Sequence, residues 1–177
     1  MLYMFLAEGF EETEAIGALD VIKRAGIDIK TVGIGKKEIT GSHGITVVAD
    51  LEENEAAEAP DGVILPGGMP GTLNLKESGF VRSNIEKCFE SGKLIAAICA
   101  APMVFGTMGL LKGKKATCYP GFEKYLEGCE YTGALTERCG NIITGKGAGA
   151  AMLFGAETAD YFKPGSGEKI LGEIYHK

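Results

Sequence analysis

A cysteine at the end of a short apolar run is the first candidate for chemistry in this sequence. Cys99 follows Leu94–Ile98, whose length predicts a buried strand, and Pro102 predicts the first turn of a helix just beyond it. A strand that passes directly into a helix at a nucleophile forms a nucleophile elbow, which needs small neighbours such as Ala97 and Ala101. The helix dipole is expected to favour the thiolate. Taken alone, the segment fits a buried structural cysteine equally well.

Glu14 is the candidate partner of this thiol. Apolar residues recur at helical spacing from Ala15 onward, and Glu11, Glu12 and Glu14 fall at the start of that helix. The positive end of the helix dipole explains acidic residues in such a place. Glu14 differs from the other two because it lies further into the helix beside Ile16, and it is expected to face the sheet. Burial there would raise its pKa, as a general acid requires.

Further candidate positions follow the ends of predicted strands. Gly67 and Gly68 end one strand and offer backbone N–H groups that suit an anion, although the segment taken alone favours a simple strand-exit turn. Tyr119 follows another strand, and loop 145–149 follows a third. Because the working groups of open parallel sheets gather outside the carboxyl ends of the strands, these segments are predicted to converge on Cys99.

Strands and helices alternate along the chain, which predicts one α/β domain over residues 1–177. Its sheet is expected to be mainly parallel, with helices on both faces. Segment 38–50 predicts a hairpin in which His43 is solvent-exposed rather than part of a site, and 52–60 predicts an acidic, solvated connection. The predicted strands cover 2–7, 27–34, 61–65, 94–98, 114–118, 131–138 and 141–144, and the predicted helices cover 11–25, 77–92, 102–106, 150–162 and 166–175.

The composition is that of an ordinary globular protein, with 45% hydrophobic residues in a chain of 177 and a net charge of −6. Lysine and arginine are scattered, so neither nucleic acid nor an anionic membrane is expected as a partner. No apolar run approaches the ~20 residues that span a bilayer. The first residues lack the basic start of a signal peptide, so they predict a first strand instead.

The cysteines are widely spaced and odd in number. This pattern predicts reduced thiols and a cytoplasmic location. No closely spaced pair of cysteines or histidines is present, so no metal site is expected. The five cysteines are Cys88, Cys99, Cys118, Cys129 and Cys139, and the histidines are His43 and His176.

Several segments that run in order through nearly the whole chain resemble the ThiJ/PfpI superfamily. They are most similar to the branch of the Parkinson-disease-associated protein deglycase and its bacterial relatives. Each segment is weak evidence alone, whereas the ordered set is specific. The segments are AEGFEETE at 7–14, DVIKRAG at 20–26, VILPGG at 63–68, IAAICA at 95–100 and GKGAG at 145–149.

The resemblance implies a flavodoxin-like α/β sandwich that is usually a homodimer and needs no cofactor. It implies that Cys99 is a reactive cysteine on a strained elbow and that a protonated Glu14 donates a hydrogen bond to its sulfur. The family's backbone donors fall on Gly68 and Ala100, with Gly67 beside them in the turn expected to bind substrate. Members are described as glutathione-independent glyoxalases acting on small aldehydes, as deglycases of early glycation adducts and as oxidative-stress proteins.

Three positions depart from the family pattern. Ala100 stands where members with protease-like or strong glyoxalase activity have a histidine, which argues against a Cys-His hydrolase. Tyr119 stands where the deglycase branch has a histidine, and a phenol is a poor base near neutral pH. Lys146 stands where the family has an arginine. His43 is a weak candidate to replace the missing active-site histidine, because the resemblance places a basic residue at its position that can approach the site across a dimer interface. Cys118 is either a core residue, which we favour, or a resolving cysteine.

Two functional hypotheses follow. In the first, Cys99 attacks the aldehyde carbon of a 2-oxoaldehyde and Glu14 moves protons, which is glyoxalase or deglycase-type chemistry by a lyase or hydrolase. In the second, Cys99 is a peroxide sensor that stops at the sulfinate, in an oxidative-stress or chaperone-like protein without efficient turnover. Amidotransferase-like or peptidase-like hydrolysis needs a histidine partner, and the scarcity of histidine argues against it.

Overall fold

The computed structural model describes residues 1–56 and 60–175. Its centre is a seven-stranded sheet with the strand order β10-β11-β7-β6-β1-β2-β5. Neighbouring strands are parallel except for β10 and β11, which are antiparallel. The strands are β1 (Leu2–Leu6), β2 (Ile29–Gly33), β5 (Leu51–Glu52), β6 (Gly62–Leu65), β7 (Leu94–Ile98), β10 (Thr136–Cys139) and β11 (Ile142–Gly145).

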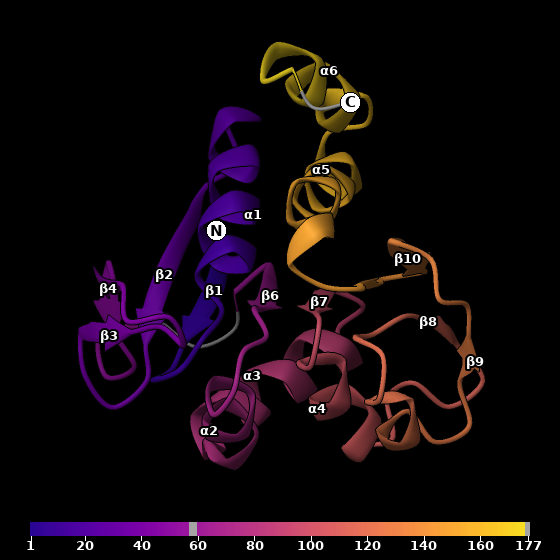
Figure 1. Ribbon diagram of the computed structural model, residues 1–177, viewed down its shortest axis with the longest axis horizontal. Coiled ribbons are helices and arrows are strands. Elements are labelled where there is room, and N and C mark those ends of the chain that lie inside the picture. Colours follow the sequence, from indigo (N-terminus) through magenta and orange to yellow (C-terminus); the bar gives the residue numbers. More distant parts are fainter. Residues whose placement is uncertain (57–59, 176–177) are drawn as a thin grey trace.

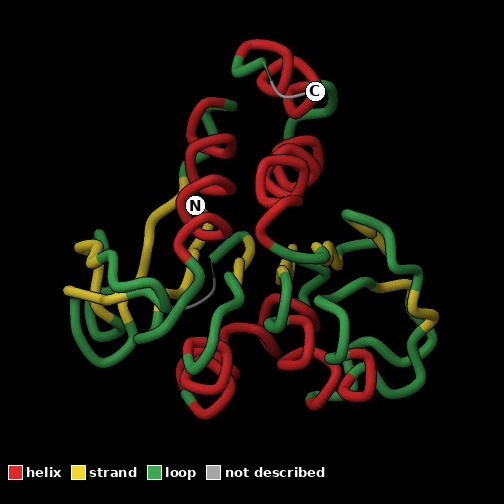
Figure 2. The backbone as a smooth tube through the Cα atoms, viewed as in Figure 1, coloured by secondary structure: helices red, strands yellow, loops and turns green. Residues whose placement is uncertain are grey.

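Helices cover both faces of the sheet (Figure 1). One face carries α1 (Glu12–Arg24), α5 (Ala151–Phe162) and α6 (Ser166–Glu173), and the other carries α2 (Gly71–Glu77), α3 (Gly79–Glu90) and α4 (Pro102–Thr107). Figure 2 shows the same layers, with the strands between two groups of helices. The predicted α/β sandwich with a mainly parallel sheet is confirmed.

Alternation along the strands divides the core into two halves. All five residues of β1 are buried: Tyr3 and Phe5 pack on the side of α3 and α4, whereas Met4 and Leu6 pack on the side of α1 and α5. Successive side chains of a strand point to opposite faces, so a parallel strand covered on both sides must be apolar throughout. The same reason makes β7 a continuous apolar run, which is why the strand before the elbow was predictable.

Two short ribbons lie outside the main sheet. β3 (Glu38–Thr40) and β4 (Thr46–Val48) form an antiparallel hairpin, which confirms the prediction for 38–50. β8 (Lys115–Ala116) and β9 (Glu130–Tyr131) pair in parallel. Two 3-10 turns, η1 (Glu123–Tyr125) and η2 (Ala148–Ala150), lie in the second half of the chain, and η2 leads directly into α5.

Two strand predictions are wrong. The strand expected at 114–118 shortens to β8, because Thr117 forms hydrogen bonds through side chains: its N–H donates to Thr144 Oγ1 (2.9 Å) and its hydroxyl donates to the Ala134 carbonyl (2.8 Å). The strand expected over 131–138 is interrupted, because β9 ends at Tyr131 and the next strand, β10, begins only at Thr136. We predicted an antiparallel edge feature over 131–144, and the antiparallel pair of β10 and β11 at the edge of the sheet confirms it. β11 also pairs with β7 on its other side.

Helix α2 was not predicted, because its seven residues are too few to show a helical period. The acidic connection predicted for 52–60 lies partly outside the described residues, and its first residue already belongs to β5. No helix in the part of the chain that the structure describes is long and apolar enough to cross a membrane.

Candidate active site

Cys99 lies on the sharp turn between β7 and α4, as the sequence predicts. Its φ angle of 65° is in the left-handed region, which a residue with a side chain occupies only where its surroundings hold it. Two backbone hydrogen bonds do so. The Cys99 N–H donates to the Gly145 carbonyl (2.9 Å), and the Tyr119 N–H donates to the Cys99 carbonyl (2.8 Å). The residue is partly buried, so the elbow presents a constrained but accessible sulfur.

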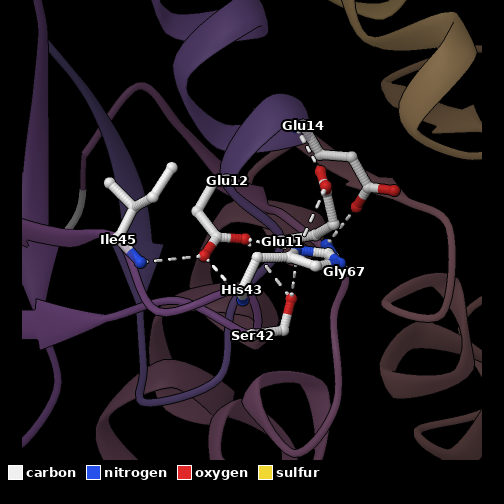
Figure 3. A network of polar contacts seen from close by, with 7 residues as sticks. All are labelled: Glu11, Glu12, Glu14, Ser42, His43, Ile45 and Gly67. Carbon is white, nitrogen blue, oxygen red and sulfur yellow. Dashed lines mark hydrogen bonds and ion pairs between the residues drawn. The ribbon is translucent and has the colours of Figure 1, made fainter.

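Glu14 approaches this thiol from the first turn of α1. The residue is 1% exposed, and its Oε2 accepts the Gly67 N–H at 2.8 Å (Figure 3). Its Oε1 is buried and has no hydrogen-bond partner among the described residues. Burial is the main cause that raises the pKa of the Glu14 carboxyl to about 7, although the Cys99 thiol and the Gly67 N–H oppose it. The predicted buried carboxyl with a raised pKa is confirmed.

The pKa of the Cys99 thiol is also raised. Burial is the largest cause, followed by the charge of Glu14 and its hydrogen bond with the thiol, while backbone N–H groups act in the opposite direction. The net effect on the thiol is therefore opposite to the one expected from a helix dipole. Helix α4 has six residues and begins only at Pro102, so it does not offset burial beside a carboxylate. The geometry instead suits transfer of the thiol proton to Glu14.

Backbone N–H groups of Ala100 and Gly68 interact with the Cys99 sulfur and lower its pKa. Gly68 has a φ of 90°, and a side chain there would collide with the backbone that precedes α1, so the position requires glycine. The predicted substrate-binding role of Gly67 needs correction, because its N–H is bound to Glu14. A Cβ at Gly67 would lie 2.7 Å from the Cβ of Cys99, so only glycine allows the two segments to approach.

A pocket of about 400 Å³ adjoins the elbow. Its lining consists of Tyr119 and Pro120, of Leu135, and of the loop 146–150 that leads into α5. The Tyr119 N–H is the group that contacts the Cys99 carbonyl. The pocket is therefore attached to the elbow through the backbone. Backbone hydrogen bonds hold Tyr119 and Gly145 against Cys99, and Gly67 lies against its Cβ, so the predicted segments do meet at the elbow.

A protein-family model described as the DJ-1/PfpI family matches residues 1–160. The chain belongs to the DJ-1/PfpI family. Protein DJ-1 homolog B of Arabidopsis thaliana is 39% identical over 160 residues, and Protein dj-1beta of Drosophila melanogaster is 36% identical over 161 residues. Each alignment covers 89% of this chain, but it spans 36% of the plant protein and 86% of the fly protein. A deglycase of Thermococcus kodakarensis is 38% identical over 113 residues, which cover 63% of this chain and 67% of that protein.

Solved structures of DJ-1 proteins share the whole fold. A DJ-1 superfamily protein from Salmonella typhimurium has a TM-score of 0.93 at 32% identity, over 99% of this chain and 98% of that chain. Oxidised Toxoplasma gondii DJ-1 has a TM-score of 0.89 at 29% identity, over 98% of this chain and 97% of that chain. The DJ-1 fold therefore extends over nearly all of this chain, in agreement with the resemblance found in the sequence.

Within this DJ-1/PfpI chain, His43 pairs with Glu12 rather than with Cys99. The His43 side chain is 70% exposed. Its backbone N–H donates to Glu12 Oε1 (2.7 Å), and its imidazole Nδ1 lies 2.9 Å from Glu12 Oε2 (Figure 3). Glu12 also accepts hydrogen bonds from Ser42 and Ile45, so it fastens the β3–β4 hairpin to α1. We predicted helix-start electrostatics for Glu12 and missed this role, for which His43 in the facing loop was the available signal.

Two further departures from the family pattern, Tyr119 and Lys146, line the pocket. Tyr119 contacts Cys99 through its backbone, and the ammonium group of Lys146 donates to a backbone carbonyl. Cys118 is fully buried on the side of α3 and α4, whereas Cys99 packs on the side of α1 and α5. Burial raises the pKa of Cys118 to about 12. Cys118 is thus a core residue, as we favoured.

One group of side chains has donors suited to a metal ion, although the sequence predicts no metal site. Ligand atoms of Glu11, Glu12 and His43 lie within 4.8 Å of one another. Imidazole and carboxylate donors of this kind suit zinc or manganese. Both oxygens of Glu12 already accept hydrogen bonds from the hairpin, so the group has a structural use without an ion.

Proposed function

We propose that this DJ-1/PfpI chain converts small reactive aldehydes by glutathione-independent glyoxalase or deglycase-type chemistry, using Cys99 and Glu14. The observation that carries the proposal is the buried Glu14 carboxyl, with a pKa of about 7, beside the thiol on the elbow. A general base works best when its pKa lies near the operating pH. The name of the Thermococcus relative, a deglycase, supports the same class of chemistry.

The first step forms a hemithioacetal with a 2-oxoaldehyde. Ionised Glu14 accepts the thiol proton while the Cys99 sulfur bonds to the aldehyde carbon, and the electron pair of the C=O bond moves onto oxygen. The N–H groups of Gly68 and Ala100, which lie beside the sulfur, stabilise the developing negative charge. Glu14 then gives its proton to the alkoxide and is ionised again.

The second step moves hydrogen between neighbouring carbons. Ionised Glu14 removes the proton from the hemithioacetal carbon, the electron pair forms a C=C bond, and the pair of the ketone C=O bond moves onto oxygen to give an enediolate. Glu14 delivers its proton to the adjacent carbon, while the proton of the hydroxyl group passes to the neighbouring negative oxygen and leaves a C=O bond at the carbon that bears the sulfur. The product is the thioester of a 2-hydroxy acid. Water then attacks the thioester carbonyl, the C–S bond breaks and the sulfur takes up a proton. The net reaction adds one water to the aldehyde and needs no external oxidant or reductant.

The test quantifies lactate formed from methylglyoxal, because loss of the aldehyde alone also reports reversible addition to any thiol. Wild type should form lactate steadily, and Cys99→Ala should form none above background. Cys139→Ala is the matched control, because Cys139 is also a partly buried free thiol but lies on edge strand β10. Absence of lactate with the wild-type protein would contradict the proposal.

A second candidate function is peroxide sensing at the same thiol. Cys99 is partly exposed and has two backbone N–H donors beside its sulfur, which suits the oxygens of a sulfinate. Two peroxide molecules would oxidise the thiol in succession, each leaving as water after its O–O bond breaks. Toxoplasma gondii DJ-1, described as oxidised, is a structural relative. Mild peroxide should add two oxygen atoms to wild type but not to Cys99→Ala; oxidation at a different cysteine would rule this function out.

We also propose a homodimer formed through the surface of α1 and the β3–β4 hairpin. Ile16 and Ile45 are 44% and 59% exposed, which is high for large apolar residues. Ile16 follows Glu12 by one helical turn, and Glu12 accepts a hydrogen bond from the Ile45 N–H, so both side chains belong to one surface. Ile45→Asp should convert a dimer to a monomer in light scattering, and a monomeric wild type would contradict the proposal.

A further inference from the structure

We infer that the pocket beside Cys99 is an apolar subsite for the substituent of the carbonyl substrate, so that 2-oxoaldehydes with an aromatic or branched alkyl group fit better than methylglyoxal. The reaction itself rests on the proposed function. The subsite is argued independently, from the position, the lining and the size of the pocket.

Both walls of the pocket are attached to the backbone of Cys99. On one side the Tyr119 N–H donates to the Cys99 carbonyl at 2.8 Å. On the other side the Cys99 N–H donates to the carbonyl of Gly145 at 2.9 Å, and the pocket lining resumes at the next residue, Lys146. Cys99 itself is not among the lining residues, but both walls are one backbone hydrogen bond away from it, and the subsite places the substituent of a molecule bound at the sulfur between them.

The lining is almost wholly apolar. Tyr119 and Leu135 are large side chains that are 50% and 55% exposed, and both border this one pocket. The remaining lining is Pro120 and small residues, apart from Lys146. The Lys146 ammonium donates to the Gly133 carbonyl at 3.0 Å, and no carboxylate lines the pocket. A charged substituent would lose water there without gaining a partner, whereas an apolar one would be favoured.

The dimensions favour a substituent larger than a methyl group. A volume of about 400 Å³ is within the range of pockets that enclose small organic ligands. The Tyr119 ring lies close to Gly147, where a Cβ would come within 3.1 Å of the ring. The ring therefore rests against a position without a side chain, and its exposed part is available to pack against a flat substituent.

The first test compares kcat/KM for phenylglyoxal and methylglyoxal, with lactate or mandelate as the measured product. Burial of one methylene strengthens binding roughly fourfold, so we expect phenylglyoxal to be preferred by about tenfold or more. Leu135→Asn, which places an amide in the pocket, should reduce this preference by at least about threefold. Leu73→Asn is the matched control, because Leu73 is a 38% exposed leucine on α2 and does not line the pocket.

A second test measures the subsite without turnover. Cys99 is alkylated with iodoacetanilide and with iodoacetamide, and the ratio of the two rates is divided by the same ratio for glutathione. A subsite should give a normalised rate ratio of about ten. The alkylation rate should reach a plateau with increasing concentration only for the aromatic reagent. Leu135→Asn should lower the ratio, and Leu73→Asn should not. Peptide mapping assigns the modification to Cys99 among the five free cysteines.

The two failures can be told apart. Preferential alkylation by the aromatic reagent in a protein that turns over neither aldehyde supports the subsite and contradicts the proposed function. Turnover of both aldehydes with alkylation ratios equal to those of glutathione, unchanged in Leu135→Asn, overturns the subsite and leaves the proposed function standing.

Discussion

Glu12 and Glu14 lie in the same turn of α1, and their pKa values shift in opposite directions. Both are buried, with exposures of 7% and 1%. Burial is the largest effect on each carboxyl and raises its pKa. At Glu12 the hydrogen bonds from His43 and from the backbone together outweigh burial and lower the pKa to about 2. At Glu14 burial prevails, and the pKa rises to about 7.

The difference lies in what each side chain faces. Glu12 faces the β3–β4 hairpin, whose His43 and Ile45 N–H groups and Ser42 hydroxyl all donate to it (Figure 3). Glu14 faces the sheet, where its donors are the Gly67 N–H and the Cys99 thiol, and its Oε1 has no partner among the described residues. Burial therefore raises the pKa of a carboxyl, and suits it to proton transfer, only where few hydrogen-bond donors face it. Where many donors face it, the carboxyl stays ionised and serves as a structural contact between segments.

The largest expected effect is the loss of lactate formation when Glu14, but not Glu12, is replaced. Glu14→Gln keeps the shape of the side chain but removes the proton carrier, so lactate formation should fall by roughly 10²- to 10⁴-fold. Wild-type kcat should rise with pH through about 7, because ionised Glu14 is the base. Steady-state lactate assays between pH 5.5 and 8.5 measure both effects.

Glu12→Gln is the matched variant for this comparison, because it makes the same change in the same turn. It should retain turnover within a few-fold of wild type and show the same rise with pH. Equal losses in the two variants would mean that the assay reports folding of α1 rather than proton transfer, and the contrast between the two carboxyls would fail.

The next effect is the loss of folding stability that burial of Glu14 causes as the pH rises. The folded-state pKa of Glu14 is raised from 4.5 to about 7, so the stability present below pH 4.5 is lost as the pH rises through 7. The loss amounts to about 3 kcal/mol, since one pKa unit corresponds to about 1.4 kcal/mol. Glu14→Gln cannot ionise and should therefore exceed wild type in urea stability at pH 8 but match it near pH 4.5. A constant difference across this range would contradict the raised pKa.

The sequence predicts the role of Glu14 better than the role of Glu12. Glu14 could be assigned because its burial and the elbow at Cys99 follow from local patterns, an amphipathic helix and an apolar strand that ends in small residues. The role of Glu12 depends on a hairpin distant in sequence, whose docking no local pattern reveals. The strand predicted to Cys118 failed for a similar reason, because Thr117 bonds to side chains and carbonyls of other segments.

A smaller effect is expected on the acid side. The pKa of Glu12 is lowered from 4.5 to about 2, so its contribution is present above pH 4.5 and is lost as the pH falls toward 2. Glu12 is buried but its partner His43 is exposed, so solvent screening reduces the contribution of Glu12 to roughly 1 kcal/mol. Glu12→Gln should be less stable than wild type at pH 6, and the difference should narrow below pH 3. Urea unfolding at both pH values measures this, and a difference that grows with acid would contradict it.

The smallest effect is the shift in the pKa of His43, which tests whether His43 and Glu12 form an ion pair. The hydrogen bond and the charge of Glu12 raise the pKa of His43 above its ordinary 6.5. The pair therefore keeps its charge at pH values where a free imidazole already loses its proton, and it weakens as the pH rises through the raised pKa. An NMR titration of the imidazole should show the raised pKa in wild type and a return toward 6.5 in Glu12→Gln. His43→Asn identifies the signal, because His176 is the other histidine of the chain. Glu14→Gln should leave the His43 titration in place, since Glu14 faces the sheet and bonds to Gly67; a His43 pKa that follows Glu14 instead of Glu12 would show that the two sides of α1 are one coupled site.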